Sequence, residues 1–268
     1  MDIDGSAVHA LFIKPAKSAQ MVDVSPAGMN VRAGHGIDGD CNAHPLSPRQ
    51  VLITRCEDLQ HFGVQPGNLR ENIVLRGVPR EAFVPGMVLG LGRQVSVRLT
   101  FHCEPCKRIA HVVRSLDEIA GRRGLVGVVV SGGRLEIGNS VAISPRRQPA
   151  LSEVPYERFL LFLGAVPRGK VVDYKQVVIG MGVADSYVRA IPRYLRRSRE
   201  EQLPIHRVVD SGGSLIPAHV PHQLEALQSE GVEVTRAEEL FGGGQFRVDL
   251  QRFSWRGNSR ASWLAMAP

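Results

Sequence analysis

Two cysteines separated by two residues form the pattern in this 268-residue chain that is best suited to chemistry. In "FHCEPCKRIA", Cys103 and Cys106 end a predicted strand and open a predicted helix, a corner where a thiolate is exposed and stabilised by helix amides. Four roles fit the pair: structural zinc, a dithiol redox centre, an inert buried pair, or one thiolate that ligates a soft metal. Zinc needs a second ligand pair, and Cys41 and Cys56 lack that spacing.

The stretch "LPIHRVVDSGG", residues 203–213, has the composition of an active-site loop but places Ile205 at its centre. A hydrocarbon side chain has no lone pair and no ionisable proton, so this position cannot supply a nucleophile. A basic run precedes the loop, and it favours either an anionic partner or a solvated face. The run consists of Arg189, Arg193, Arg196, Arg197 and Arg199.

Short alternating apolar runs between residues 38 and 144 predict strands over 49–54, 71–77, 95–101 and 127–143. They indicate a closed or sandwiched antiparallel β-structure. We expect "SGGR" at 131–134 to form a hairpin turn. The 3.6-residue apolar spacing of 107–121 predicts a helix between the strands.

Residues 144–155, rich in proline and small polar residues, have the composition of a linker. We therefore predict two domains, residues 1–148 and 149–268. The second reads as helical over 156–166, 174–182 and 185–198, with Asp185 as a helix N-cap, and the last two helices indicate a helix-turn-helix. Pro192 either kinks the last helix or marks its true start.

The overall composition is that of a soluble globular protein, with 43% apolar and 22% charged residues. The first thirty residues lack a secretory signal pattern, and no uncharged apolar run reaches the length of a membrane span. We expect a cytoplasmic protein that does not contact a membrane. The formal net charge of +7 is weak evidence for an anionic partner.

The first half resembles the MOSC domain, named after the C-terminal domain of molybdenum-cofactor sulfurase. The resemblance covers about residues 5–145 and rests, in order, on "HGIDGDCNAHP", "RQVLI", "PGNLRENIVLRG", "GMVLGLG", "CEPC" and "GGRLEIGNSVAI". It implies a β-barrel that binds the molybdenum cofactor, molybdenum carried by a pterin (molybdopterin), with Cys106 as metal ligand and catalytic residue. It also implies that Arg49, Arg70 and Asn72 hold the cofactor's polar parts.

Other residues of this half depart from the family or have a second interpretation. Asp40 and His44 match the same motifs, but each would equally satisfy the polar groups of a loop. Relatives commonly have a basic residue where this chain has Cys41.

The second half resembles the DNA-binding domain of the methylated-DNA cysteine methyltransferases, and more closely their alkyltransferase-like relatives that lack the acceptor cysteine. The resemblance covers about residues 155–257 and rests on "VPRGKVVDYKQVVIGMG", "SYVRAIPRYLRR", "LPIHRVVDSGGSL", "LEALQSEGVEV" and "RFSWRG". In repairing relatives, the residue before His-Arg-Val accepts the alkyl group, and here that residue is Ile205.

The same resemblance assigns roles to the residues that contact DNA. It implies that Arg189 enters the space of a flipped base and that Tyr174 presses on the phosphate backbone, although Tyr174 is equally interpretable as a core aromatic. Arg193, Arg196 and Arg197 would bind phosphates. Ile205, His206 and Arg207 would line the base pocket.

The sequence thus predicts a mainly antiparallel β-barrel followed by a mainly α, winged helix-turn-helix-like domain. The hypothesis for function is a molybdenum-cofactor protein that recognises modified bases in DNA, with reduction of N-hydroxylated bases as its reaction. Two alternatives stay open. One is a non-enzymatic sensor whose second domain flags damage for repair proteins, with the barrel as a partner-binding scaffold. The other is a sulfur-transfer or small-molecule reductase with regulatory DNA binding.

Overall fold

The computed structural model describes residues 2–237, 245–257 and 264. These residues form two compact units, residues 2–153 with Leu264, and residues 154–257. The division between 153 and 154 falls inside the segment 144–155 whose composition indicates a linker. The domain limits at 148 and 149 stay a prediction.

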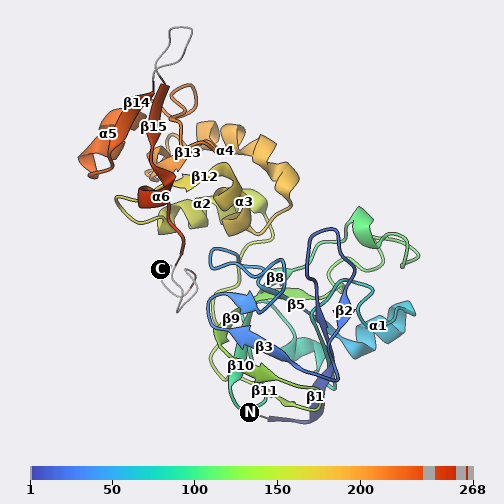
Figure 1. Cartoon of the computed structure of the whole chain (residues 1–268). Coiled ribbons are helices and arrows are strands. Elements are labelled where there is room, and N and C mark those ends of the chain that lie inside the picture. Colours follow the sequence, from blue (N-terminus) through green and yellow to red (C-terminus); the bar gives the residue numbers. More distant parts are fainter. Residues whose placement is uncertain (1, 238–244, 258–263, 265–268) are drawn as a thin grey trace. The chain divides into compact units, whose positions relative to one another are not determined.

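In the described part of the first unit, seven strands form a closed barrel, in the order β11-β7-β8-β9-β5-β6-β1, with β1 pairing back onto β11 (Figure 1). Neighbouring strands are antiparallel except β5 and β6. This confirms the predicted barrel. The strands are β1 (Asp2–Ile13), β5 (Val51–Arg55), β6 (Ile73–Arg76), β7 (Val88–Leu91), β8 (Val95–His102), β9 (Leu125–Ser131) and β11 (Ser140–Ile143).

Smaller elements surround the barrel. Strand β2 (Val22–Asp23) pairs with β1, and β10 (Gly133–Leu135) pairs with β3 (Met29–Arg32), which also pairs with β4 (Gly36–Ile37). Helix α1 (Cys56–Phe62) follows β5, and a short 3₁₀ helix, η1 (Arg80–Ala82), follows β6.

The barrel is filled by aliphatic side chains from its strands, among them Leu11, Ile53, Ile73 and Leu99. A second apolar cluster lies against the opposite faces of β1 and β6, where Phe12 and Val74 contact residues of α1 and of the 107–121 segment. Successive side chains of a strand point to opposite faces, so these two strands are buried on both. This double burial leaves little of the barrel wall open to solvent here.

The predicted helix over 107–121 is wrong. The chain forms only a 3₁₀ helix, η2 (Lys107–Ile109), followed by turns, with bonds such as Val112 N–H to Ile109 O at 3.1 Å. Ile109 and Ile119 are nevertheless buried in the second apolar cluster. Consecutive turns bring apolar residues to one side as a helix does, so the spacing did not distinguish the two.

The predicted hairpin turn at 131–134 is also wrong, because β9 and β10 do not pair with each other. The chain instead leaves the barrel sheet at Gly132 to join β3. A Cβ at Gly132 would lie 2.5 Å from the carbonyl oxygen of Val31, so only glycine fits this close approach.

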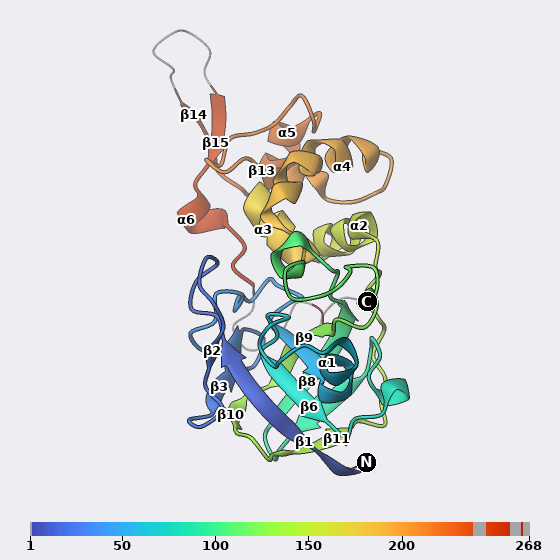
Figure 2. The same cartoon turned by 90° about the vertical axis from the view of Figure 1, so that its right-hand side faces the viewer.

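The second unit is mainly helical, as predicted (Figures 1 and 2). Its elements are α2 (Pro155–Ala165), β12 (Val172–Asp173), α3 (Tyr174–Met181), η3 (Asp185–Ala190), α4 (Ile191–Arg197), η4 (Ile205–Arg207), β13 (Val208–Val209), α5 (Gln223–Ser229), β14 (Val234–Ala237), β15 (Gln245–Val248) and α6 (Leu250–Phe253). Strands β14 and β15 form an antiparallel pair, and β12 pairs with β13 in parallel.

The helix-turn-helix region differs in detail from the prediction. Helix α3 begins with a capping box between Asp173 and Gln176 and ends at Gly182 in the left-handed conformation, φ 65°. Asp185 is the first residue of η3, and the N-cap position is taken by Ala184 instead. Pro192 lies in the first turn of α4, so the proline marks the true start of this helix.

We predict that Gly180→Ala destabilises the second unit although alanine favours helix. A Cβ at position 180 would lie 2.2 Å from ring atoms of the buried Phe162, so α2 and α3 must move apart, at a cost of roughly 1–3 kcal/mol. The Trp255 ring stacks on Phe162, so tryptophan fluorescence during urea unfolding reports this contact.

Gly164→Ala is the matched control, because its Cβ would meet only Leu203, at 3.7 Å. We expect this variant to be as stable as the parent or slightly more stable, since it gains helix propensity. Equal stability of the two variants would contradict the close packing of α2 on α3.

Candidate functional site

The two cysteines of the CEPC motif differ in accessibility. Cys103 is 1% exposed, and Nη2 of Arg49 lies 3.4 Å from its sulfur. Cys106 is half-buried, and Nη1 of Arg123 lies 3.6 Å from its sulfur. Only the second thiol is therefore open to a ligand as well as adjacent to a cation.

The structure bears on one of the alternatives for these cysteines, the structural zinc site. Cys41, Cys56, Cys103 and Cys106 are all free thiols. Within the ranges that the structure describes, no three His, Cys, Asp or Glu side chains gather as a metal-binding group. A structural zinc site therefore lacks its ligands there.

Basic residues that the sequence did not single out join the predicted Arg70. Burial lowers the pKa of Lys14, and the nearby positive charges of Arg70 and Arg108 lower it further. Arg123 is 5% exposed and donates to the carbonyl oxygens of Glu104 and Leu69, the residue before Arg70. Among the described residues, the buried Nε of Arg123 has no hydrogen-bond partner.

This set of donors fits a molybdenum cofactor. A thiolate is the ligand type that soft metals prefer, and guanidinium and ammonium groups bind the oxygens of an anionic pterin phosphate. The unpartnered Nε of Arg123 adds a buried donor next to the thiol. Arg70 is held at φ 67°, an uncommon conformation for a residue other than glycine, so its backbone position is strongly constrained.

Asn72, predicted to bind the cofactor, has its amide engaged by the protein. Its Nδ2 donates to Asp40 at 2.7 Å and to the Phe12 carbonyl at 3.2 Å, and its Oδ1 accepts from the Leu52 N–H at 3.0 Å. Asn72 is only 2% exposed. These contacts brace the barrel wall behind the basic residues.

The side chains of Asp40 and His44 accept hydrogen bonds from backbone N–H groups around their loop, which was the simpler of their two interpretations. Asp40 accepts from the Lys14 N–H and the Asn42 N–H at 2.9 and 2.8 Å. His44 Nδ1 accepts from the Leu46 N–H at 3.1 Å.

In the second unit, the predicted DNA-contacting arginines fall into two groups. Arg189, in η3, and Arg193, in α4, are exposed, and the described residues offer them no hydrogen bond or ion pair. Arg196 instead contacts Nδ1 of His219 at 3.2 Å, and the Arg197 guanidinium lies 3.8 Å from the centre of the Tyr156 ring. All four are exposed, but among the described residues only the second pair contacts another side chain, so the first pair is the less constrained.

Tyr174 is half-buried at the first position of α3. Burial raises the pKa of its phenol, and the nearby Asp210 carboxylate raises it further. That carboxylate accepts from the N–H groups of Gly212 and Ser214 in the loop after β13. The structure thus places a negative charge beside the tyrosine predicted to press on a phosphate.

Glu230, at the end of α5, organises the loop around Ile205. Its carboxylate accepts from His206 Nε2 at 2.9 Å, from Nε and Nη2 of Arg207 at 2.9 and 2.6 Å, and from the Gly169 N–H at 3.0 Å. Ile205 itself is half-buried. The described contacts of the His206 and Arg207 side chains are therefore structural.

Comparison with known families places both units. Residues 47–142 match the model of the MOSC domain, and residues 155–232 match the model described as 6-O-methylguanine DNA methyltransferase, DNA binding domain. The first unit therefore contains a segment similar to the MOSC domain, and the second a segment similar to the methyltransferase DNA-binding domain. Ile205, at the position where the resemblance described above implies an acceptor cysteine, lies inside the second matched segment.

Several solved structures are similar to parts of the chain. YuaD from Bacillus subtilis is 19% identical over 52% of this chain and 95% of its own, with a TM-score of 0.45. YiiM from Geobacillus stearothermophilus is 15% identical over 70% and 98%, with a TM-score of 0.43. S. pombe Atl1, solved with damaged DNA containing O6-carboxymethylguanine, is 24% identical over 38% and 94%, with a TM-score of 0.34. No curated protein matches significantly.

Sequence reasoning missed four residues that belong to the two candidate sites. Lys14 and Arg123 of the first unit carry no motif spacing, and Arg108 follows the CEPC motif, which gave it no role. Glu230 of the DNA-binding domain lies in "LEALQSEGVEV", which carries the family resemblance, but the motif gave it no role.

In the described ranges, no helix is long and apolar enough to span a membrane.

We predict that the DNA-binding domain loses stability in acid through Glu230. Burial raises the pKa of this carboxyl, but the bonds from Arg207, Gly169 and His206 outweigh it and lower the pKa from 4.5 to about 2. The folded state favours the ionised form, so this stabilisation is present above pH ~4.5 and is lost as the pH falls to ~2. The shift corresponds to roughly 3 kcal/mol.

Urea unfolding between pH 7 and 2.5, followed by tryptophan fluorescence, measures this loss. Glu230→Gln should be less stable at pH 7 and should show a flatter dependence on pH below 5. A variant with the parent's acid dependence would show that other carboxyl groups cause it.

Proposed function

We propose that the MOSC domain binds a molybdenum cofactor through Cys106 and that the fused domain recognises modified bases in DNA without removing their alkyl groups. The observation that carries the first half is the half-buried Cys106 thiol beside the buried, incompletely bonded Arg123. The second half is carried by Ile205, which stands where the methyltransferase family has its acceptor cysteine.

Each residue of the MOSC site has a distinct role in this proposal. Cys106 supplies the thiolate ligand, and Arg123 holds that sulfur in place with its guanidinium. Lys14, Arg70 and Arg108 supply positive charge for the pterin phosphate. When bound, the cofactor supplies two-electron redox chemistry, which suits the reduction of an N-hydroxylated amine or a sulfur transfer.

The DNA-binding domain supplies affinity and base recognition. Exposed Arg193 binds phosphate, and exposed Arg189 fills the space that a flipped base leaves in the duplex. The half-buried Ile205 forms an apolar part of the pocket wall, held by the His206, Arg207 and Glu230 contacts. The chain therefore binds a modified base but transfers no alkyl group to itself.

Fusion of the two domains favours a substrate that is itself a base in DNA. A tether keeps two sites at a high effective concentration, so a base extruded by one domain is available to the other. A base with an N-hydroxylated exocyclic amine meets both conditions: the second domain would extrude it from DNA, and the cofactor would reduce it.

We predict that Cys106→Ser abolishes molybdenum binding and that Cys103→Ser retains it. Cys106 is half-buried beside Arg123, whereas Cys103 is 1% exposed and contacts Arg49. Elemental analysis of protein from a host that makes the cofactor should find stoichiometric metal in the parent and at most a tenth as much in Cys106→Ser.

A thermal unfolding scan of each variant serves as the folding control, because Cys103 is part of the packed barrel wall. Stoichiometric molybdenum in Cys106→Ser together with its loss from a folded Cys103→Ser would reverse the assignment.

We also predict that two exposed arginines contribute differently to DNA binding. Arg193→Gln should weaken binding to every duplex and lower the salt dependence of log K by about one unit, as for one lost phosphate contact. Arg189→Ala should instead reduce the preference for a duplex with O6-methylguanine, since an unfilled gap costs on the order of a few kcal/mol. Fluorescence titration at several salt concentrations measures both.

Arg168→Gln removes the same charge outside η3 and α4 and serves as the control. Its side chain bonds the Ser229 carbonyl, and we expect it to leave the salt dependence unchanged. Equal behaviour of the three variants would mean that the surface binds DNA through net charge alone.

A further inference from the structure

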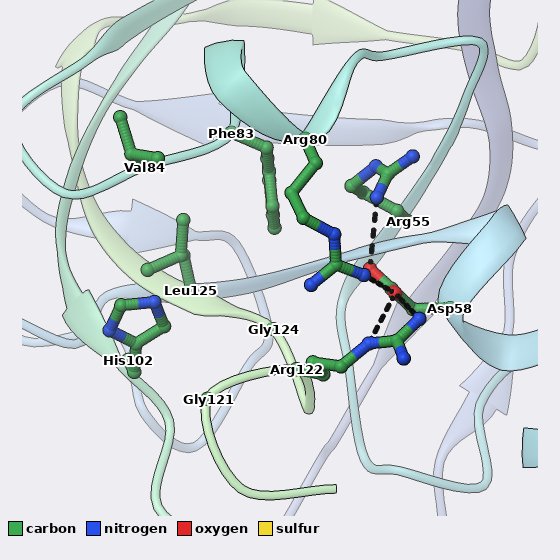
Figure 3. Close-up of a pocket in the computed structure, with 10 residues that line it drawn as sticks. All are labelled: Arg55, Asp58, Arg80, Phe83, Val84, His102, Gly121, Arg122, Gly124 and Leu125. Atoms are coloured by element: carbon green, nitrogen blue, oxygen red, sulfur yellow. Dashed lines mark hydrogen bonds and ion pairs between the residues drawn. The ribbon is translucent and has the colours of Figure 1, made fainter.

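A separate cavity of about 170 Å³ lies in the MOSC unit, at one end of the barrel (Figure 3). Its lining includes the last residues of β5 and β8, Arg55 and His102, and the first residue of β9, Leu125. None of its lining residues belongs to the sets assigned above to the cofactor or to DNA.

Three arginines converge on one buried carboxylate in the cavity wall. Asp58 is 4% exposed, and its Oδ2 lies 3.3 Å from Nη1 of Arg55. Its Oδ1 accepts from Nη2 and Nε of Arg122 at 2.8 and 3.1 Å and also from Arg80. Glu57 lies 3.5 Å from Arg55, so three arginines share two carboxylates in this network, and a third carboxylate, Glu153, is paired with His102 of the cavity lining at 2.8 Å.

Of the three arginines, Arg80 is the most accessible to a ligand. Its side chain is 51% exposed, against 30% for Arg122 and 11% for Arg55. Arg122 is also fixed by the ring of Phe62, whose centre lies 5.2 Å from its guanidinium carbon. Figure 3 shows one terminal nitrogen of Arg80 bonded to Asp58 and the other turned away from it.

The apolar side chains that line the cavity would accommodate a small apolar group. Phe83, Val84 and Leu125 supply hydrocarbon surface next to the Arg80 guanidinium. An apolar cavity of about 150 Å³ is known to hold one benzene ring. A planar guanidinium pairs with a carboxylate through two parallel hydrogen bonds.

We propose that this cavity binds a small organic monocarboxylate, with its carboxylate on Arg80 and a body about the size of a benzene ring against Phe83. A single accessible guanidinium that already bonds one carboxylate matches a monoanion better than a phosphate dianion. The site shares no residue with those assigned above to the cofactor or to DNA.

Isothermal titration of the full-length protein with benzoate tests the proposal. We expect saturable binding of benzoate and at least tenfold weaker binding of benzamide, which has the same shape without the charge. Arg80→Gln should weaken benzoate binding at least tenfold. Arg93→Gln removes an exposed arginine of the same unit outside the cavity and should change it less than twofold.

Val84→Phe fills the apolar part and keeps every charge, so it should abolish binding even if Arg80→Gln fails to fold. Cys106→Ser should bind benzoate like the parent, which separates this site from the cofactor site. The proposal is overturned if the parent shows no saturable heat, if folded Arg80→Gln binds like the parent, or if benzamide binds as tightly as benzoate.

Discussion

Closure of the barrel by β1 is the constraint on which the candidate cofactor site depends. This strand pairs with β11 through its first half and with β6 through its second. Gly5 lies between the shifted pairings to β11 at φ 74°, as expected where a strand must bend. The end of β1 is then fixed by Asn72, which donates to the Phe12 carbonyl, and by Asp40, which accepts from the Lys14 N–H. Lys14 reaches the site only because these bonds hold.

The sequence predicted the elements whose signal is local. The strands over 51–55, 73–76 and 95–102 appear close to where apolar alternation indicates them, and Gly182 ends α3 as a helix stop signal should. The helix over 107–121 failed because apolar spacing reports burial on one side and not the hydrogen-bond pattern. Strand β1 was missed because it is long and bent and has no partner nearby in the sequence.

The candidate sites were predictable where a motif carries the residue and not where distant segments meet. Cys106 and Ile205 were identified from motifs. Asp58 and Arg122 lie 64 positions apart and share no pattern, so their contact in the cavity wall has no sequence signal. The assignment of Asn72 to the cofactor stays a prediction, and its hydrogen bonds to Leu52 and Asp40 are contacts that a sequence does not show.

Glu230 explains why an active-site-like loop is built around an isoleucine. One carboxylate joins Gly169, His206 and Arg207, and the Arg207 side chain also donates to the Val166 carbonyl at the end of α2. The loop at 205–207 is thereby connected to α2 and α5 without any contribution from the side chain of residue 205. Loss of a nucleophile at that position leaves these bonds intact, whereas loss of His206 or Arg207 would leave a buried carboxylate with fewer partners. The framework of the loop is therefore independent of the side chain at residue 205, and an isoleucine there needs no compensating change in the contacts around it.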